Sequence, residues 1–146
     1  MPEIVALFKS RKDALITTLV WLIVLVPVLI IGYGTPLMAE GIPKTLTHMF
    51  GALIAAVVMW MWISTFYIVK GDILFYQSGP FRGRVAINQI TKIEKTFSSK
   101  VAPALSRDRF RIIFNEDEEE LLVSPEDEGE FIATLKKINP KIQLNL

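Results

Sequence analysis

The sequence predicts two membrane-spanning helices followed by a small antiparallel sheet, curled or partly closed into a barrel, with one helix at its C-terminal end. Charge distribution is the first observation: residues 14–69 carry two charged side chains, Glu40 and Lys44, whereas residues 70–146 carry 24. A charged side chain at the centre of an inserting helix costs about 2.5–3.5 kcal/mol. The second observation is a series of short alternating stretches separated by turn residues, which predicts strands. We therefore place the aqueous domain at residues 65–146.

Residues 14–31 form the first predicted membrane helix. They carry no charge and include 13 Leu, Ile and Val residues. A helix over this whole segment is long enough to cross a hydrocarbon core of roughly 30 Å. Pro27 should kink this helix, a distortion that neighbouring helices tolerate in membranes. A buried soluble helix is one alternative, but this chain has little else to wrap it. A signal peptide is another, since Lys9, Arg11 and Lys12 precede the run, yet the run is long for one.

Residues 46–64 form the second predicted membrane helix. Gly51 and Ala55 are small residues that allow close helix contact, so the membrane helices could support a homo-oligomer. Trp60 and Trp62 are expected at the lipid headgroup level, where aromatic rings concentrate.

Basic residues flank the two helices and predict their orientation. Lys9, Arg11 and Lys12 precede the first helix, and Lys70, Arg82 and Arg84 follow the second. The positive-inside rule then predicts a two-pass protein of the cytoplasmic membrane with both termini in the cytoplasm. Residues 1–13 become a cytoplasmic N-terminal segment, and residues 32–45 an external loop.

The predicted sheet begins directly after the second helix. Thr65–Gln77 reads as a hairpin whose turn is formed by Lys70, Gly71 and Asp72. Alternation is clearest where Phe110, Ile112 and Phe114 share one face of a strand. Further strands are predicted at Phe81–Ile87, Thr91–Phe97, Arg109–Phe114 and Glu119–Val123, with a polar turn at Asn115–Glu118.

A C-terminal helix is predicted to close this sheet. Ser124 is a suitable N-cap, Pro125 suits the first helical position, and Asp127 completes a pattern that resembles a capping box. Phe131, Leu135 and Ile138 fall on one face, with Ile132 beside them. This apolar stripe should pack against the sheet.

Four segments together resemble a known group of bacterial proteins: Tyr67–Leu74, Gly79–Ile93, Ala104–Arg109 and Ser124–Phe131. In these segments the chain resembles the bacterial pleckstrin-homology-like (PH-like) families that follow one or two membrane helices. It is most similar to the short family that includes the sublancin immunity protein. The resemblance covers roughly the second half of the chain and implies a PH-like fold at a membrane, more than any activity.

Several kinds of chemistry have no signal in the sequence. The chain has no cysteine and one histidine, His48, so thiol chemistry and Cys- or His-rich metal sites are excluded. The acidic run Glu116–Glu120 lacks the spacing and glycine of a calcium loop. A net charge of +1 gives no support to nucleic-acid binding. We expect a protein that is not an enzyme and has no cofactor or metal.

Basic residues between positions 82 and 111 form the one candidate site. Held near the inner leaflet, they could meet anionic lipid headgroups or a membrane protein. The alternative is that they are solvated strand residues paired with the domain's acids, since residues 70–146 carry twelve of each charge. The candidate contacts are Arg82, Arg84, Lys92, Arg107 and Arg109.

These observations favour a non-enzymatic, membrane-anchored interaction module with a PH-like domain at the inner membrane face. A bacteriocin-immunity-like protein is one narrower form of this function. The alternative is a small oligomeric transport or channel subunit. That function requires polar groups within the bilayer, and the helices offer little beyond Thr17, Thr18 and Ser64.

Overall fold

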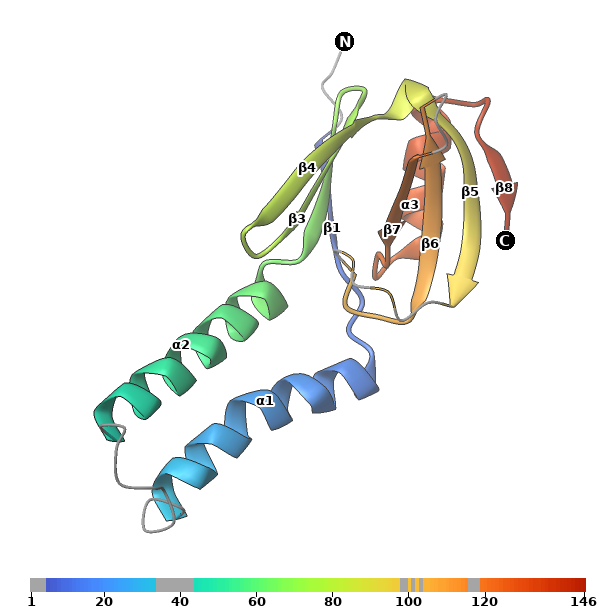
Figure 1. The fold of residues 1–146 in the computed structure, drawn as a ribbon. Helices are drawn as coiled ribbons and strands as arrows, with labels where there is room; N and C mark the ends of the chain where they lie inside the picture. The colour runs from blue at the N-terminus through green and yellow to red at the C-terminus, as the bar shows by residue number, and fades with distance from the viewer. Residues whose placement is uncertain (1–4, 34–43, 98–99, 101, 103, 116–118) are drawn as a thin grey trace.

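The protein folds into two four-stranded sheets and a short helix, with a pair of longer helices projecting from one end (Figure 1). This computed structural model describes residues 5–33, 44–97, 100, 102, 104–115 and 119–146. The predicted external loop, residues 32–45, lies mostly outside the described residues. Side chains from both sheets and from the last helix, α3 (Glu128–Ile138), form one buried core.

The first sheet has the strand order β1-β2-β3-β4 and contains a strand that the sequence analysis missed. β1 (Val5–Lys9) falls within residues 1–13, which were predicted as a segment separate from the domain. It instead pairs antiparallel with β2 (Phe66–Lys70) along its whole length, and Phe8 is buried in the core. A single short strand with a distant partner gives no hairpin signal in a sequence. The domain therefore includes residues on both sides of the two long helices.

The remaining strands largely follow the prediction. The hairpin at Thr65–Gln77 is confirmed as β2 and β3 (Ile73–Ser78), with Gly71 in the left-handed conformation at the turn. β4 (Phe81–Ala86) and a short 3-10 helix, η2 (Ile87–Gln89), lead to the second sheet. That sheet has the order β7-β6-β5-β8. Its strands are β5 (Ile90–Phe97), β6 (Asp108–Phe114), β7 (Glu119–Val123) and β8 (Gln143–Asn145).

In the second sheet, one strand was not predicted, and one predicted turn lies partly outside the described residues. β8 was not predicted; it pairs in parallel with β5 after α3 has returned the chain. The predicted turn at Asn115–Glu118 includes residues 116–118, which lie outside the described residues.

Helix α3 confirms the predicted apolar stripe but not the predicted cap. Phe131 and Leu135 are fully buried, and the rings of Phe131 and Phe8 meet edge-on with centroids 5.2 Å apart. The cap is Asp127, whose side chain accepts a hydrogen bond from the Glu130 N–H over 2.9 Å. Ser124 lies farther upstream and bonds to the N-terminal segment instead. The helix thus packs directly on the first strand.

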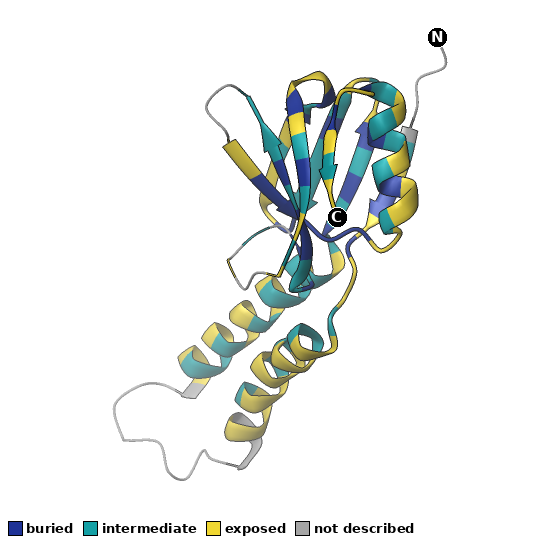
Figure 2. Cartoon of the chain, turned by 90° about the vertical axis from the view of Figure 1, so that its right-hand side faces the viewer, coloured by how far each residue is buried: buried dark blue, intermediate teal, exposed yellow. Residues whose placement is uncertain are grey.

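The two long helices, α1 (Ala14–Tyr33) and α2 (Lys44–Ile63), lie side by side outside the domain. Most of their apolar side chains are exposed (Figure 2). In the described part of the chain, Thr45–Ile63 is long and apolar enough to cross a membrane, whereas Ala14–Ile30 is apolar but shorter. Two membrane spans therefore stay a prediction.

The turn between β3 and β4 rests on the end of α2. A Cβ atom at Gly79 would lie 2.6 Å from Met61 Cγ, and the φ angle of Gly79 is 56°. Both the close approach and the left-handed conformation require glycine here. The sheet and the helix pair are thus in direct contact.

Candidate functional site

The domain forms hydrogen bonds and an ion pair with the N-terminal segment at the start of α1. Asp13 caps the helix, because its carboxylate accepts the Leu15 N–H over 3.1 Å. The Asp13 N–H in turn donates to the Leu105 carbonyl over 3.0 Å, and Arg107 Nε lies 3.3 Å from the same carboxylate. The first turn of α1 is therefore fixed to the loop that precedes β6.

Three buried hydroxyl groups join the strands at this end of the domain. The hydroxyl groups of Ser10 and Ser124 are 3.0 Å apart, and the Tyr67 hydroxyl donates to Ser10 over 3.4 Å. The Ser124 N–H donates to the Tyr67 oxygen over 3.0 Å, and the Leu105 N–H donates to Ser10 Oγ over 3.0 Å. Burial raises the pKa of Tyr67, so its hydroxyl stays protonated as a donor. This network satisfies polar groups that would be costly to bury alone.

Arg109 organises the loop that receives these contacts. Its side chain is only 4% exposed, and its guanidinium donates to the carbonyl oxygens of Lys100, Ala104 and Ser106. The charge of Arg109 is thus used inside the protein, where it holds backbone carbonyl groups in place.

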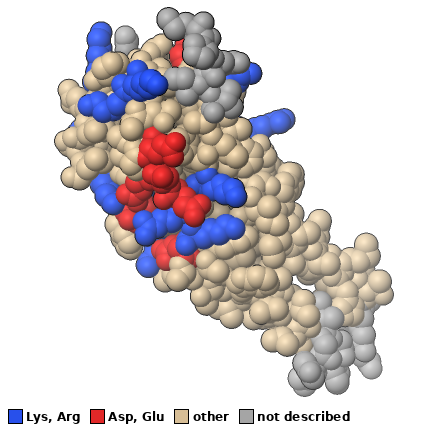
Figure 3. All heavy atoms as spheres, turned by 180° about the vertical axis from the view of Figure 1, so that it is seen from behind, with Lys and Arg blue, Asp and Glu red and all other residues tan. Residues whose placement is uncertain are grey.

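A surface cluster of charges closes the same junction on the outside. Arg11 lies 3.2 Å from Glu128 and 3.6 Å from Asp108, and Lys95 lies at the same distances from the same two carboxylates. The hydrogen bond from Lys95 to Glu128 raises the pKa of the lysine. From behind the molecule, acidic side chains gather in a group flanked by basic ones (Figure 3).

Two of the four segments that carry the sequence resemblance, Ala104–Arg109 and Ser124–Phe131, therefore share one role. Both meet residues 8–13: through Leu105, Arg107 and Asp108 in the first, and through Ser124, Glu128 and Phe131 in the second. The Glu126 N–H also donates to the Lys9 carbonyl over 2.9 Å. We call this set of contacts the junction. It fixes the domain relative to α1, as Gly79 and Met61 do for α2.

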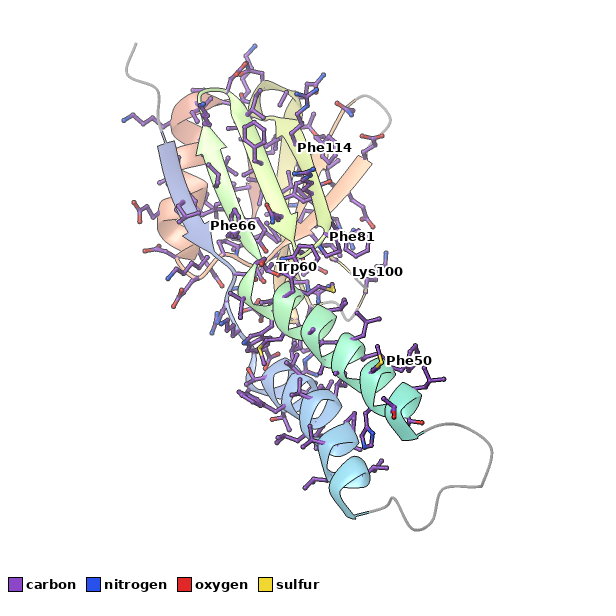
Figure 4. The ribbon with its side chains drawn as sticks, turned by 90° about the vertical axis from the view of Figure 1, so that its left-hand side faces the viewer. Phe50, Trp60, Phe66, Phe81, Lys100 and Phe114 are labelled. Atoms are coloured by element: carbon purple, nitrogen blue, oxygen red, sulfur yellow. The ribbon has the colours of Figure 1, made fainter. Side chains whose placement is uncertain are left out.

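A second notable surface is the side of the first sheet that faces away from the core. Leu7, Ile68 and Phe75 lie in register across β1, β2 and β3, and Arg84 continues this row on β4. Phe66 lies in the next row, toward the helix end of the face (Figure 4). Two hollows of about 420 and 490 Å³ share Phe66 and Ile68 as lining. We call this surface the outer face.

The structure separates the five basic residues that the sequence analysis grouped. Arg82 and Arg84 are exposed on β4 and line one hollow of the outer face. Lys92 belongs to the other sheet and pairs with Glu94, Arg107 pairs with Asp13, and Arg109 is buried. Of the five candidate contacts, Arg82 and Arg84 therefore lie together, and the other three lie elsewhere.

Two basic residues of the outer face were missed. Lys9 and Lys12 line the hollow nearest the helices, and Lys12 Nζ lies 4.8 Å from the centre of the Trp62 ring. In the sequence, both lysines were interpreted only as indicators of membrane orientation. Alternation of Phe8 with Leu7 and Lys9 was the available hint of a strand.

The described ranges contain no candidate metal site. No three His, Cys, Asp or Glu side chains come together there in a way that could hold an ion.

Acidic pH should weaken the contacts of the junction, because it protonates Asp13. The Leu15 N–H, followed by Arg107, holds the pKa of Asp13 below its ordinary value of 3.8. Because the folded-state pKa is the lower one, this stabilisation is present above about pH 4 and is lost as the pH falls through the folded-state pKa. Thermal unfolding of the full-length protein across this range should show that Asp13→Asn is less stable than the wild type at neutral pH and less sensitive to acid.

Asp72→Asn provides the control for this experiment. Asp72 is exposed in the β2–β3 turn, so its replacement should leave the acid profile of the wild type unchanged. Identical acid profiles for Asp13→Asn and the wild type would show that Asp13 does not couple α1 to the domain.

Comparison with known protein families identifies a match over the domain. Residues 65–139 match the sequence model of a family described as "Bacterial PH domain". The matched segment runs from the start of β2 to the end of α3, so it includes both junction segments but not β1. No curated protein and no solved structure matches the chain.

Proposed function

Because this chain belongs to the bacterial PH domain family, we propose that it acts as a non-enzymatic, membrane-anchored interaction module. Its two long helices would cross the cytoplasmic membrane and present the domain at the inner face. Its partners would be membrane proteins or anionic lipid headgroups. A PH-like domain is a fold for binding proteins or lipids, and the fold alone does not choose between these partners.

Insertion of the helix pair between two paired strands is the observation that carries this proposal. β1 enters α1 and α2 returns directly to β2, and the Ser10 N–H donates to the Thr65 carbonyl over 3.3 Å. The helices expose large apolar side chains, including Leu29 (55%), Phe50 (66%) and Leu53 (61%). Contiguous exposed apolar surface of this kind marks an interaction with a membrane or a protein.

The junction supports a module with a fixed orientation. Both helices connect to the domain without a flexible linker, and both are tied to it by the contacts of Asp13 and of Gly79 with Met61. A domain held in this way cannot range far from the bilayer, so its partners lie in or on the same membrane.

Single-cysteine labelling can test the anchoring and the orientation, because the chain has no native cysteine. In intact cells, Glu40→Cys should react with a membrane-impermeant maleimide, whereas Lys141→Cys should react only after the membrane is permeabilised. The protein should also stay with the membrane after a carbonate wash. Labelling of Lys141→Cys in intact cells, or release by carbonate, would contradict the proposal.

A bacteriocin-immunity-like role is a narrower form of the same proposal, supported by the sequence resemblance described above. It predicts that a strain lacking the protein becomes sensitive to a bacteriocin. Unchanged sensitivity would reject this role and leave the broader proposal in place.

A further inference from the structure

The outer face combines apolar and basic side chains in a way that a freely solvated sheet does not need. Its centre is apolar: Leu7 is 59% exposed, and Phe66, Ile68 and Phe75 are partly exposed around the two hollows. One hollow opens beside Trp62 and Ile63, the end of α2. The apolar surface is therefore continuous from the helix to the sheet.

Basic residues border this apolar centre on two sides. Lys9 and Lys12 lie at the β1 side, and Arg82 and Arg84 lie on β4. No Asp or Glu lines either hollow, and among the described residues no carboxylate pairs with Arg82 or Arg84. Arg11, Lys92 and Lys95, which lie at the junction and on the second sheet, are by contrast paired with acids. Lys9 also lines a neighbouring hollow that contains Glu126, Asp127, Glu128 and Glu130. The β4 side of the outer face thus carries positive charge, from Arg82 and Arg84, directly beside apolar surface.

The helices slant away from the domain beneath this same face. In Figure 1 the first sheet lies on the left, and both helices run from the domain toward the lower left. If the helices are turned upright across a bilayer, the outer face tilts toward the bilayer surface. Figure 4 looks onto this face and shows α2 continuing directly below it. Both the orientation of the outer face and its mixture of apolar and basic side chains therefore indicate that the bilayer surface lies next to it.

We infer that the outer face docks on the anionic inner leaflet of the membrane in which the helices are anchored, an inference that rests on the proposed function. Lys9, Lys12, Arg82 and Arg84 would contact lipid phosphates, and each cation near an anionic surface strengthens binding. Phe66, Ile68 and Phe75 would lie at the boundary between headgroups and acyl chains, where apolar side chains of surface-bound elements are buried. The ligand is the anionic surface itself, so no particular headgroup is required.

Quenching in lipid nanodiscs tests this docking on the full-length chain. A fluorophore on Gln77→Cys would report on the outer face, because Gln77 lies between Phe66 and Arg82 in the strand register. Lipids with a nitroxide on the headgroup should quench it strongly in discs of phosphatidylglycerol and phosphatidylcholine, and weakly in phosphatidylcholine alone. The same fluorophore on Ala133→Cys, exposed on α3, should be quenched weakly in both.

Charge reversal provides the matched comparison. Arg82→Glu with Arg84→Glu should reduce the docked population in anionic discs on the order of tenfold or more, since each cation near such a surface contributes roughly fivefold. Lys137→Glu with Lys141→Glu makes the same change in net charge at exposed positions near the C-terminus. It should leave the quenching of Gln77→Cys unchanged.

Two results would overturn the inference: equal quenching of Gln77→Cys in neutral and anionic discs, or equal effects of the two charge reversals. Either result would favour a protein, rather than the lipid surface, as the partner of the outer face. A fluorophore on Val26→Cys, within α1, separates this failure from a failure of the proposed function. Quenching of Val26→Cys by lipids with a nitroxide on the acyl chain reports insertion, whether or not the outer face docks.

Discussion

A fragment that begins at Thr65 is expected to remain unfolded, although it contains the entire segment matched by the family model. It lacks β1, so β2 loses one of its two partner strands and Phe131 loses the ring of Phe8. Loss of a buried phenylalanine side chain costs about 3–5 kcal/mol. The lost strand pairing and the lost junction contacts add to that cost, and a small domain has only roughly 5–15 kcal/mol of stability.

The matched control for this fragment keeps β1 and removes the helices. Lys9 and Phe66 are paired neighbours, so a short Gly-Ser linker between Asp13 and Ser64 can replace the helical insertion. Circular dichroism should show a cooperative thermal transition for the linked protein and none for the fragment. Equal transition temperatures would show that β1 is not part of the domain core.

Replacement of Arg109 with methionine should be the most damaging change to a charged residue of the domain. Methionine keeps much of the side-chain volume but leaves the carbonyl groups of Ala104 and Ser106 without their charged donor. An unsatisfied buried polar group costs about 1–3 kcal/mol. We expect a loss of roughly 2–4 kcal/mol in unfolding free energy, together with loosening of the loop that holds Ser10 and Asp13.

Arg111→Met is the matched control, two residues farther along the same strand. Arg111 is about one-third exposed and pairs with Glu120 over 3.3 Å, and surface pairs of this kind contribute about 0–1 kcal/mol. Chemical unfolding of both variants, with hydrogen exchange of the Leu105 amide as a local probe, checks the difference. Similar losses for the two variants would refute the structural role of Arg109.

Local patterns were enough to predict most of the domain. Alternation of Phe110, Ile112 and Phe114 identified β6, turn residues at Gly71 identified the β2–β3 hairpin, and helical spacing placed Phe131 and Leu135 in the core. Each of these signals lies within one element or two adjacent ones. For this reason they can be read from a single sequence.

Features that depend on distant partners could not be predicted in this way. The pairing of β1 with β2 spans the whole helical insertion, and the burial of Arg109 depends on how the preceding loop folds over it. Ser124 has the chemistry of a helix cap, but a partner far away in the sequence, Ser10, takes its hydroxyl group. The separation of Arg82 and Arg84 from Lys92 likewise follows from their places in different sheets.

Insertion of the helix pair between β1 and β2 also sets the order of events during synthesis. β1 leaves the ribosome first, but its partner strand follows only after both helices have been made. Closing so long a loop costs conformational entropy, and bringing the two ends of an inserted helix pair together lowers that cost. In the proposed membrane arrangement, the sheet can be completed only after both helices have entered the bilayer. A chain that fails to insert then leaves Phe8 unburied and one edge of β2 unpaired, which exposes the chain to proteolysis.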